Sequence, residues 1–475
     1  MTYRETLVYL DDLERLGIKP GLSRIKKLLY LLGNPHRRLR VIHIAGTNGK
    51  GSTAAFISSI LKESGYKTGL YISPHLTDFR ERISINGKRI PSTSAARILT
   101  ECKTLAARRV RGIKKPGSTS LEYLTYFEIV TAAAFSHFAR EKVDFAVVET
   151  GMGGRWDATN VVKPLISVIT NSDYDHMDIL GANISSIAAE HAGIIKKGAP
   201  VITASSGKAL QVIKKVCRQR NTRLFHINTD INYEFLKSDL KRQSFNIYPA
   251  GNNGENGVFS EFKNLTIPLL GKYQLTNACC AVAAIELLRA PERACPRGKT
   301  RKGGVVNAPW RACPRPSELI SDESIRKGLS KTRWPGRLEI VNRSPLVILD
   351  GAHNLPAAKQ LRKALLEFLG NNKRLILVLG ILKDKEVGKI VRELVPLAFK
   401  VIVTSSKTSR AVLPDDLYKI AVKYNRNVSV ISEVEEALQY ALCEAKKNDI
   451  VCITGSLYTV GEARRFFAER RCSDC

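Results

Sequence analysis

A glycine-rich turn with a single lysine is the part of the sequence most suited to binding phosphate. Gly46-Thr47-Asn48-Gly49-Lys50-Gly51-Ser52 follows the apolar run Arg40–Ala45 and leads into a helix-like stretch from Ser52 to about Ser64. In such a strand–turn–helix, glycines let backbone N–H groups converge on phosphate oxygens, and the start of the helix favours negative charge. Lys50 would reach the outer phosphates of a nucleotide. The turn departs from the common phosphate-loop pattern, because Gly51 separates the lysine from the hydroxyl residue.

Two further apolar runs end in acidic or polar side chains. Phe145–Thr150 has Glu149 near its end and is followed by Gly151–Arg155, while Leu165–Thr170 is followed by Asn171–Asp178. Because the carboxyl ends of parallel strands meet at one edge of a sheet, we expect these groups beside the lysine turn, where oxygen ligands for Mg²⁺ belong. An ordinary strand-end acid and a solvated acidic loop are the alternative interpretations.

Four polar or glycine-rich loops repeat this arrangement in the last third of the chain. Each follows an apolar, strand-like run, and together they comprise Asp350–Asn354, Gly380–Lys385, Ser405–Arg410 and Gly455–Tyr458. Loops at the carboxyl ends of parallel strands form the ligand-binding edge of an α/β sheet. The sequence therefore predicts a second ligand-binding edge that faces the first, with ATP enclosed between two domains.

Strand-like and helix-like segments alternate from about residue 39 onward, which predicts an α/β fold with parallel sheets. Residues 1–290 are expected to form a P-loop, mononucleotide-binding domain with a mostly parallel sheet. Residues 291–330 begin in a stretch rich in Pro, Gly, Arg and Lys and are interpreted as a linker or surface insertion. Residues 331–475 are expected to form a Rossmann-like α/β domain with strands at Leu346–Asp350, Arg374–Gly380, Lys400–Thr404 and Asp449–Gly455.

The composition is that of an ordinary globular protein with a strong positive charge. Hydrophobic residues make up 44% and charged residues 25% of the 475 positions. Apolar runs stay well short of the roughly 18 residues of a membrane span, and the N-terminus resembles neither a signal nor a transit peptide, so we expect a cytoplasmic protein without membrane association. With 75 basic and 44 acidic residues the net charge is +31, which attracts anions. Since no nucleic-acid-binding motif accompanies that charge, nucleic acid is not an expected partner.

The ten cysteines give little evidence of chemistry. Only Cys472-x-x-Cys475 has metal-binding or redox spacing, and its place at the extreme C-terminus favours a frayed tail. A disulfide framework is not expected in a large chain without an export signal.

Ten motifs follow one another along the chain. They read HIAGTNGKGST (43–53), YISPHLTDFRERISING (71–87), TYFEIVTAAAF (125–135), VVETGMGGRWDATN (147–160), DHMD (175–178), LLGKYQLTNA (269–278), WPGRLEIV (334–341), ILDGAHN (348–354), GILKDK (380–385) and TGSLYTVGEA (454–463). In this order they resemble the folylpolyglutamate synthase/dihydrofolate synthase family, a branch of the Mur ligase superfamily. The resemblance covers essentially the whole chain except about 230–262 and 290–330.

The resemblance implies a two-step ligation. The γ-phosphoryl group of ATP moves to a substrate carboxylate, and the amino group of L-glutamate then displaces phosphate from the acyl phosphate to form an amide. The acceptor would be dihydropteroate, a reduced folate or both, and two Mg²⁺ ions would assist. A monomer is expected.

Positions that match the family motifs imply a role for each site residue. The catalytic residues would be Lys50, Glu149 and His176. ATP would be bound by Gly46, Thr47, Asn48, Gly49, Lys50, Gly51 and Ser52, together with Asn277, Arg337, Asp350 and His353. One Mg²⁺ ion would be held by Ser73 and Glu149 and a second by His176, and the pterin side would be lined by Thr125, Phe127, Arg155 and Asp157.

One position departs from the family. The motif that usually carries a carbamylated lysine reads Glu190-His191-Ala192-Gly193-Ile194 here. The hypothesis is that His191 lies near the second metal, so that metal binding fails as the pH drops through roughly 6.5, the ordinary histidine pKa. The alternative is that His191 only packs against the helix beginning near Ile184, and that His176, water and substrate hold the metal.

Two other functions remain open on the sequence. A sister Mur-type ligase acting on a cell-wall nucleotide precursor would share the phosphate loop and the domain order. A basic P-loop NTPase acting on nucleic acid would explain the charge of +31 but not the C-terminal motifs.

Overall fold

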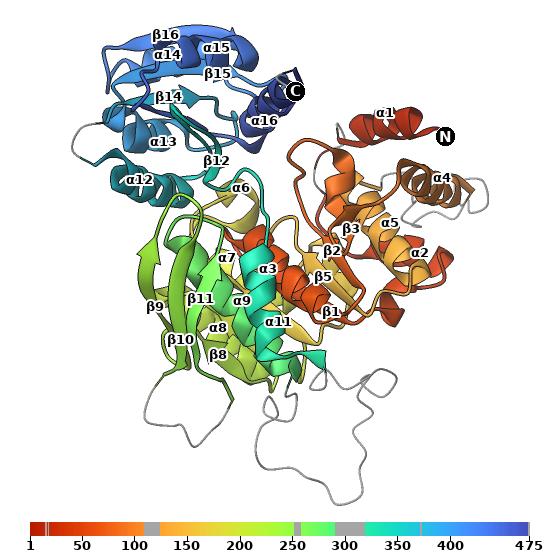
Figure 1. The fold of residues 1–475 in the computed structure, drawn as a ribbon. Coiled ribbons are helices and arrows are strands. Elements are labelled where there is room, and N and C mark those ends of the chain that lie inside the picture. Colours follow the sequence, from red (N-terminus) through yellow and green to blue (C-terminus); the bar gives the residue numbers. More distant parts are fainter. Residues whose placement is uncertain are drawn as a thin grey trace, which may run out of the picture.

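The computed structural model describes residues 1–14, 17, 19–108, 124–250, 258–289, 319–370 and 373–473. These residues form two α/β bodies, with the C-terminal one, blue in Figure 1, above the rest of the chain. Within these ranges, no helix is long and apolar enough to cross a membrane. Cys475 and the side chain of Cys472 lie outside the described residues.

The N-terminal body is built on an eight-stranded sheet in the order β4-β3-β2-β5-β1-β6-β7-β8. All neighbouring strands from β2 to β8 run parallel, whereas β3 and β4 add an antiparallel edge. The strands are β1 (Val41–Ala45), β2 (Thr68–Tyr71), β3 (Ile83–Ile85), β4 (Lys88–Arg89), β5 (Phe145–Glu149), β6 (Ile166–Ile169), β7 (Val201–Thr203) and β8 (Leu224–His226).

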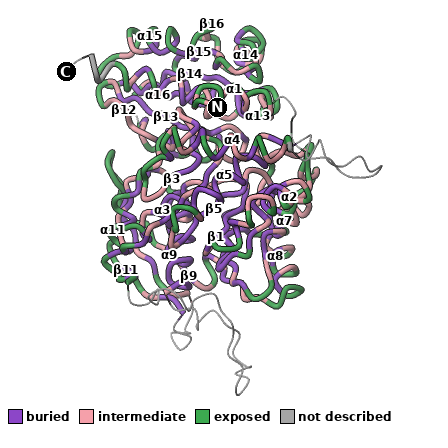
Figure 2. The backbone as a smooth tube through the Cα atoms, turned by 90° about the vertical axis from the view of Figure 1, so that its right-hand side faces the viewer, coloured by how far each residue is buried: buried purple, intermediate pink, exposed green. Residues whose placement is uncertain are grey.

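Helices cover both faces of this sheet. Along β1, Ile42 and Ile44 belong to the core on one face of the sheet, while Val41 belongs to a separate core on the other face. Figure 2 shows the buried backbone concentrated in the central strands. The helices of this body are α1 (Tyr3–Glu14), α2 (Ser23–Leu31), α3 (Lys50–Glu63), α4 (Ser92–Arg108), α5 (Tyr126–Arg140), α6 (Met177–Leu180), α7 (Ile184–His191), α8 (Gly207–Gln219), α9 (Tyr273–Arg289) and α11 (Asp322–Lys331). Helix α3 begins two residues earlier than the sequence predicted, so that Lys50 is helical.

A small antiparallel sheet, which the sequence did not predict, covers α9. It consists of β9 (Ile231–Ser238), β10 (Gln243–Pro249) and β11 (Phe262–Ile267) in the order β11-β10-β9. Its inward side chains Phe245, Ile247 and Phe262 extend the core around α3 and α9.

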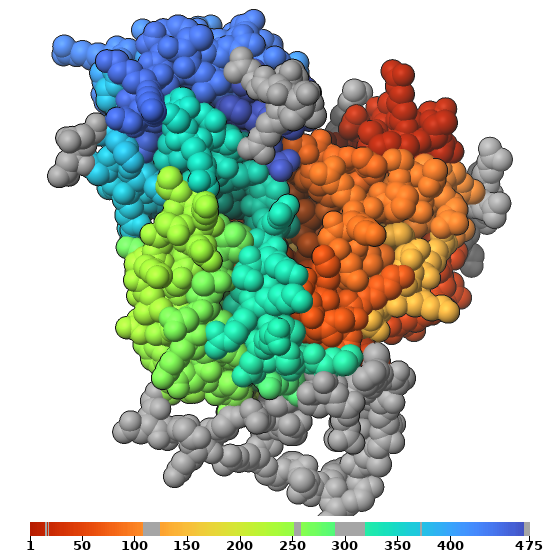
Figure 3. Space-filling view, in the orientation of Figure 1, coloured from red at the N-terminus to blue at the C-terminus, as the bar shows by residue number. Residues whose placement is uncertain are grey.

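Most of the expected linker, residues 291–330, lies outside the described residues. Its last part forms α11, which packs closely on α3: a Cβ on Gly328 would lie 2.4 Å from the Cα of Ile60. In Figure 3 this teal segment runs between the green and orange surfaces. The chain therefore returns across the N-terminal body before it enters the C-terminal one.

The C-terminal body contains a six-stranded sheet in the order β12-β13-β17-β14-β15-β16, antiparallel only between β12 and β13. The strands are β12 (Glu339–Arg343), β13 (Leu346–Leu349), β14 (Leu375–Leu379), β15 (Lys400–Ser405), β16 (Val428–Glu433) and β17 (Ile450–Thr454). Helices α12 (Leu355–Leu369), α13 (Val387–Leu394), α14 (Pro414–Ala421), α15 (Val434–Glu444) and α16 (Leu457–Ser473) flank it. The predicted α/β class is confirmed, and the four predicted strands correspond to β13, β14, β15 and β17.

Candidate active site

The glycine-rich turn connects β1 to α3 and passes directly over neighbouring side chains. Gly46 and Gly49 have φ values of +141° and +82°, which glycine adopts without strain. A Cβ on Gly46 would lie 2.1 Å from Thr170 Oγ1, and one on Gly49 would lie 2.3 Å from Asn277 Oδ1. Both positions therefore require glycine, and the turn brings Asn277 on α9 against the phosphate loop.

Lys50 folds back over this turn. Its Nζ donates hydrogen bonds to the carbonyl oxygens of Gly46 (2.8 Å) and Thr47 (3.1 Å). Burial lowers the pKa of the ammonium group, an effect that the carboxylates of Glu149 and Asp175 oppose. Because backbone carbonyls are weaker partners for an ammonium group than phosphate oxygens, Lys50 is available to a nucleotide phosphate.

Glu149 ends β5 in a buried position beside Ser73. Its Oε2 accepts a hydrogen bond from the backbone N–H of Ser73 (3.3 Å), and the Ser73 hydroxyl is buried without a hydrogen-bond partner among the described residues. Burial raises the pKa of Glu149 to about 7, against the opposing field of Lys50. A buried carboxylate and an unpartnered hydroxyl are oxygen donors of the kind that Mg²⁺ prefers.

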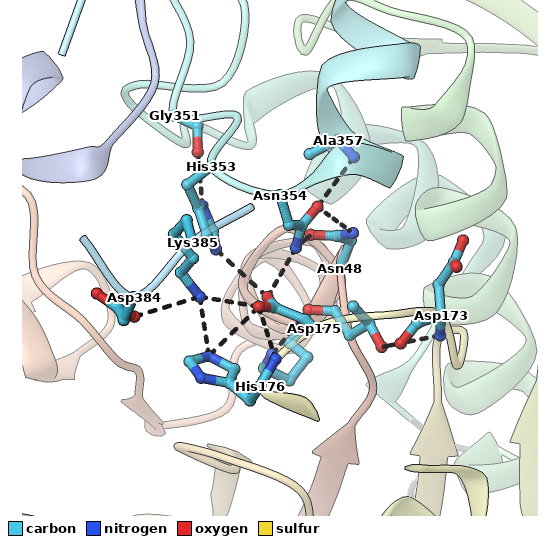
Figure 4. A network of polar contacts seen from close by, with 12 residues as sticks. Asn48, Asp173, Asp175, His176, Gly351, His353, Asn354, Ala357, Asp384 and Lys385 are labelled. Carbon is cyan, nitrogen blue, oxygen red and sulfur yellow. Dashed lines mark hydrogen bonds and ion pairs between the residues drawn. The ribbon is translucent and has the colours of Figure 1, made fainter. Parts of the chain in front are cut away.

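Asp175, in the loop after β6, is the centre of a polar network between the two bodies (Figure 4). Its Oδ1 accepts from Lys385 Nζ (2.8 Å) and its Oδ2 from Asn354 Nδ2 (2.7 Å), while His353 Nε2 lies 3.8 Å from Oδ2. The side chains of Asp175 and Lys385 are only 9% and 5% exposed. Although burial raises the pKa of Asp175, the fields of His176, Lys385 and His353 hold it below its usual range.

The same lysine also contacts His176. Lys385 Nζ lies 3.2 Å from His176 Nε2, so a cation from the C-terminal body occupies the space next to the residue expected to bind the second Mg²⁺ ion. His176 itself has a φ of +49° just before α6. Burial lowers its pKa, which favours the neutral imidazole.

Asn48 links the phosphate loop directly to the C-terminal body. Its Nδ2 donates to Asn354 Oδ1 (3.2 Å), and Asn354 Nδ2 donates to Asn48 Oδ1 (3.1 Å). Asn354 also caps α12 by accepting a hydrogen bond from the backbone N–H of Ala357. The start of α12 is thereby held against the turn that would bind ATP.

His191 is the last residue of α7 and is buried. Its Nδ1 hydrogen-bonds to the hydroxyl of Ser172 over 2.8 Å. Burial lowers the pKa of His191 to about 3, and the nearby Lys50 adds to this effect. The expectation that His191 titrates near pH 6.5 is therefore wrong, because its imidazole stays neutral far below that pH.

Asp350 and Arg337 lie together at the junction of the two bodies. Asp350 accepts hydrogen bonds from the N–H groups of Leu338 and Ala352, and the hydroxyl of Tyr273 lies 3.4 Å from its Oδ2. Burial raises the pKa of Asp350, whereas the field of Arg337 lowers it. Arg337 acts on Glu149 in the same direction, so its charge reaches both buried carboxylates.

A cavity of about 1320 Å³ lies between the bodies. Its lining includes six of the expected site residues, namely Ser73, Thr125, Phe127, Asp157, His176 and His353. It does not include Lys50, Glu149, Arg155, His191, Asn277, Arg337 or Asp350. The cavity therefore opens on the expected pterin side, and its link to the phosphate loop is Asn354, a lining residue that hydrogen-bonds to Asn48.

Three of the four residues expected on the pterin side also hold the backbone in place. Thr125 caps α5 in a reciprocal arrangement with Glu128. Asp157 accepts hydrogen bonds from the N–H groups of Gly151 and Met152, which fixes the loop after β5. Arg155 Nη2 donates a hydrogen bond to the backbone carbonyl of Ala189 on α7 (3.2 Å), and its Nε lies 3.6 Å from a carboxylate oxygen of Glu190.

The sequence did not single out Asp175 or Lys385 as site residues. Both residues belong to loops that were expected to form the ligand-binding edges. The sequence therefore indicated where Asp175 and Lys385 lie, but not that they form an ion pair with each other. The pairing depends on how two bodies far apart in sequence meet.

The metal ligands are only partly assembled. In the described ranges, no group of three or more His, Cys, Asp and Glu side chains is arranged to hold a metal ion. Ser73 and Glu149 fit one Mg²⁺ ion by their chemistry and burial. At His176 the donor set does not fit a second ion in this arrangement, because the Lys385 ammonium already lies against it.

Comparison with known proteins agrees with this architecture. Residues 44–285 match the family "Mur ligase middle domain" and residues 336–457 match "Mur ligase, glutamate ligase domain". The chain is 36% identical over 466 residues to the dihydrofolate synthase/folylpolyglutamate synthase of Bacillus subtilis, covering 98% of each chain.

Solved structures show the same likeness. The folylpolyglutamate synthase of Thermotoga maritima has 35% identity and a TM-score of 0.77, covering 98% of this chain and 96% of that one. E. coli FolC in complex with DHPP and ADP has 28% identity and a TM-score of 0.80, covering 98% of both. The chain therefore belongs to the dihydrofolate synthase/folylpolyglutamate synthase family of Mur ligases.

Proposed function

We propose that this chain is an ATP-dependent ligase that joins L-glutamate to dihydropteroate, to reduced folates, or to both. The observation that carries the proposal is the cavity of about 1320 Å³ between the two bodies, which is lined by Thr125 and Phe127 from the N-terminal body and by His353, Asn354 and Lys385 from the C-terminal body. Asn354 connects it to the phosphate loop through its hydrogen bonds to Asn48. Its size suits a pterin with its aminobenzoyl arm. The relatives named for this activity support the same conclusion.

In the first step, an oxygen of the substrate carboxylate attacks the γ-phosphorus of ATP, and ADP leaves. Lys50 and Arg337 would neutralise the negative charges that this approach brings together, which is the main catalytic effect in phosphoryl transfer. Ser73 and Glu149 would hold a Mg²⁺ ion, which supplies further charge neutralisation at the phosphates. Two such ions would be needed for the expected pair, but a second ion near His176 would require the Lys385 ammonium group to lie elsewhere than it does in this arrangement.

In the second step, the amino group of glutamate attacks the acyl carbon and phosphate leaves. The wall from the C-terminal body carries Lys383, Lys385 and Arg410, whose charges suit a dicarboxylate. Closure of the two bodies would exclude water, which would otherwise hydrolyse the acyl phosphate. We propose a monomer that works in the cytoplasm.

The test is ATP turnover measured with L-glutamate and a panel of acceptors. Dihydropteroate and tetrahydrofolate should each be offered separately, with product mass identifying the amide. A UDP-linked muramyl peptide, DNA and RNA serve as the competing acceptors. Turnover with one of these and none with either pterin substrate would contradict the proposal, and sedimentation would measure the oligomeric state.

A further inference from the structure

Arg82 is a buried cation on the cavity wall that the mechanism above does not use. The residue is only 7% exposed and lines the cavity. It ends the short helical turn Phe79–Arg82, which Asp78 and Glu81 close with a capping box. Its backbone carbonyl accepts a hydrogen bond from the N–H of Ile72 (3.1 Å), so the position of Arg82 is fixed at its backbone.

Two uncharged side chains hold the guanidinium group in place, and neither of them compensates its positive charge. Its Nε donates to Nδ1 of His75 (2.9 Å), and its central carbon lies 5.1 Å from the ring centroid of Tyr126. Burial lowers the pKa of His75 to about 4, so that the imidazole is a neutral acceptor and brings no compensating charge. These contacts fix the plane of the guanidinium and leave its two terminal nitrogens for another partner.

The acids near this turn are engaged elsewhere. Asp78 forms ion pairs with Arg80 and Arg89, and Glu81 accepts from the backbone of Leu76 and the hydroxyl of Thr77. Among the residues that the structure describes, no carboxylate forms an ion pair with Arg82 within 4.0 Å. A buried cation is costly unless an anion compensates it, so the arrangement calls for one from a ligand.

The neighbours of Arg82 in the wall indicate which anion that is. Tyr126, whose ring lies against Arg82, stands between Thr125 and Phe127, which are expected to contact the pterin. Ile72, which donates its N–H to the Arg82 carbonyl, directly precedes Ser73, which is expected to bind Mg²⁺ beside ATP. The part of the substrate between its ring system and the γ-phosphate is the carboxylate that becomes phosphorylated. The field of Arg82 also lowers the pKa of Glu149, which places the guanidinium near that reacting end.

We infer that Arg82 binds the reacting carboxylate of the pteroate or folate substrate, with its two terminal nitrogens donating to the two carboxylate oxygens. The inference rests on the proposed function and adds the residue that positions the nucleophile. A planar fork matches a carboxylate, whereas a lysine would offer a single point contact. The same contact would reduce the repulsion between carboxylate and ATP.

The experiment compares equilibrium binding of pteroate with that of its neutral carboxamide, measured by ligand fluorescence without ATP. Pteroate carries only the reacting carboxylate, so the comparison isolates that group. The wild type should prefer the acid by about 10- to 100-fold, the range of a charge-assisted hydrogen-bonded pair. Arg82→Gln should bind acid and amide equally, with amide affinity unchanged. Arg82→Lys should keep only part of the preference, because it retains the charge without the fork.

Arg89→Gln is the matched control, since Arg89 is 45% exposed and pairs with Asp78 and Glu81. It should keep the full preference, and unchanged ADP binding would show that each variant is folded. A folded Arg82→Gln protein that still prefers the acid tenfold or more would overturn the inference. If Arg82→Gln does not fold, full preference in Arg82→Lys would overturn the bidentate contact. A wild type that binds neither ligand would instead refute the proposed function.

Discussion

Replacing Glu149 with glutamine should make the protein more stable at alkaline pH and less responsive to Mg²⁺. The carboxyl is 4% exposed, and burial raises its pKa from 4.5 to about 7. Between these values the folded protein binds a proton that the unfolded chain has lost, so stability falls as the pH rises through this window. This difference in pKa lowers the free energy of unfolding by about 3 kcal/mol in total as the pH rises above 7. About 2 kcal/mol of that decrease falls between pH 5.5 and pH 8.

The assay is denaturant unfolding of wild type and Glu149→Gln at pH 5.5 and pH 8, in EDTA. Glutamine cannot ionise, so the stability difference between the two proteins should shift by about 2 kcal/mol in favour of the variant at pH 8. Glu323→Gln, an exposed acid on α11, is the control and should shift little between the two pH values. If the difference in unfolding free energy between Glu149→Gln and wild type is the same at both pH values, Glu149 does not have the raised pKa of a buried acid.

Mg²⁺ adds a second readout to the same experiment. If Glu149 is a ligand, Mg²⁺ with ADP should stabilise the wild type beyond ADP alone, by about 2.7 kcal/mol at a hundred times the dissociation constant. The glutamine variant should gain little from the metal. Equal gains in both proteins would remove Glu149 from the metal site.

Three further changes test other parts of the site. Lys50→Ala should abolish ligation while leaving the unfolding curve nearly unchanged, and near-normal turnover would disprove the phosphate-loop assignment. Lys385→Met should destabilise the protein by about 3 kcal/mol in denaturant unfolding, because Asp175 stays buried without its cation. Lys383→Met, at an exposed neighbouring position, is the control and should change the stability by less than about 0.5 kcal/mol. If the His191 imidazole is a metal ligand, His191→Gln should alter the Mg²⁺ concentration that turnover requires and remove any preference for Mn²⁺. Turnover of the wild type should not depend on added bicarbonate. Metal titrations that are the same in wild type and His191→Gln would show that His191 is only a packing residue hydrogen-bonded to Ser172.

The strands that the sequence predicted correctly are buried on both faces. β1, β5 and β6 in the first body and β13, β14, β15 and β17 in the second are continuous apolar runs, which a parallel sheet requires. The strands β12 and β16 were missed because they are half-exposed edges with mixed sequences. The sheet of β9, β10 and β11 was missed for a similar reason, since β9 is largely exposed.

For the site, the sequence predicted which loops form it more reliably than which side chains contact each other. The glycines at 46 and 49 could be assigned from the turn alone, because positive φ and close approach leave few other residues possible. The protonation state of His191 could not be assigned from the sequence, because its pKa depends on burial and on Lys50, which only the fold brings near. Arg82 was part of a recognised motif, but the motif does not show that its guanidinium is buried without an acid.

The pairing of Asp175 with Lys385 explains how closure of the two bodies and nucleotide binding can depend on each other. Among the described residues, the side chains in direct contact with the Asp175 carboxylate, apart from His176, come from the C-terminal body: Lys385, His353 and Asn354. Separation of the bodies would replace these partners with water, so the pairing favours the closed arrangement. Asp175 and Lys385 both act electrostatically on the ammonium group of Lys50, so a phosphate bound at Lys50 would also enter the field of the Lys385 cation. The nucleotide site and the contact between the two bodies therefore share one set of charges, and in this arrangement the Lys385 ammonium group lies where a Mg²⁺ ion at His176 would have to bind.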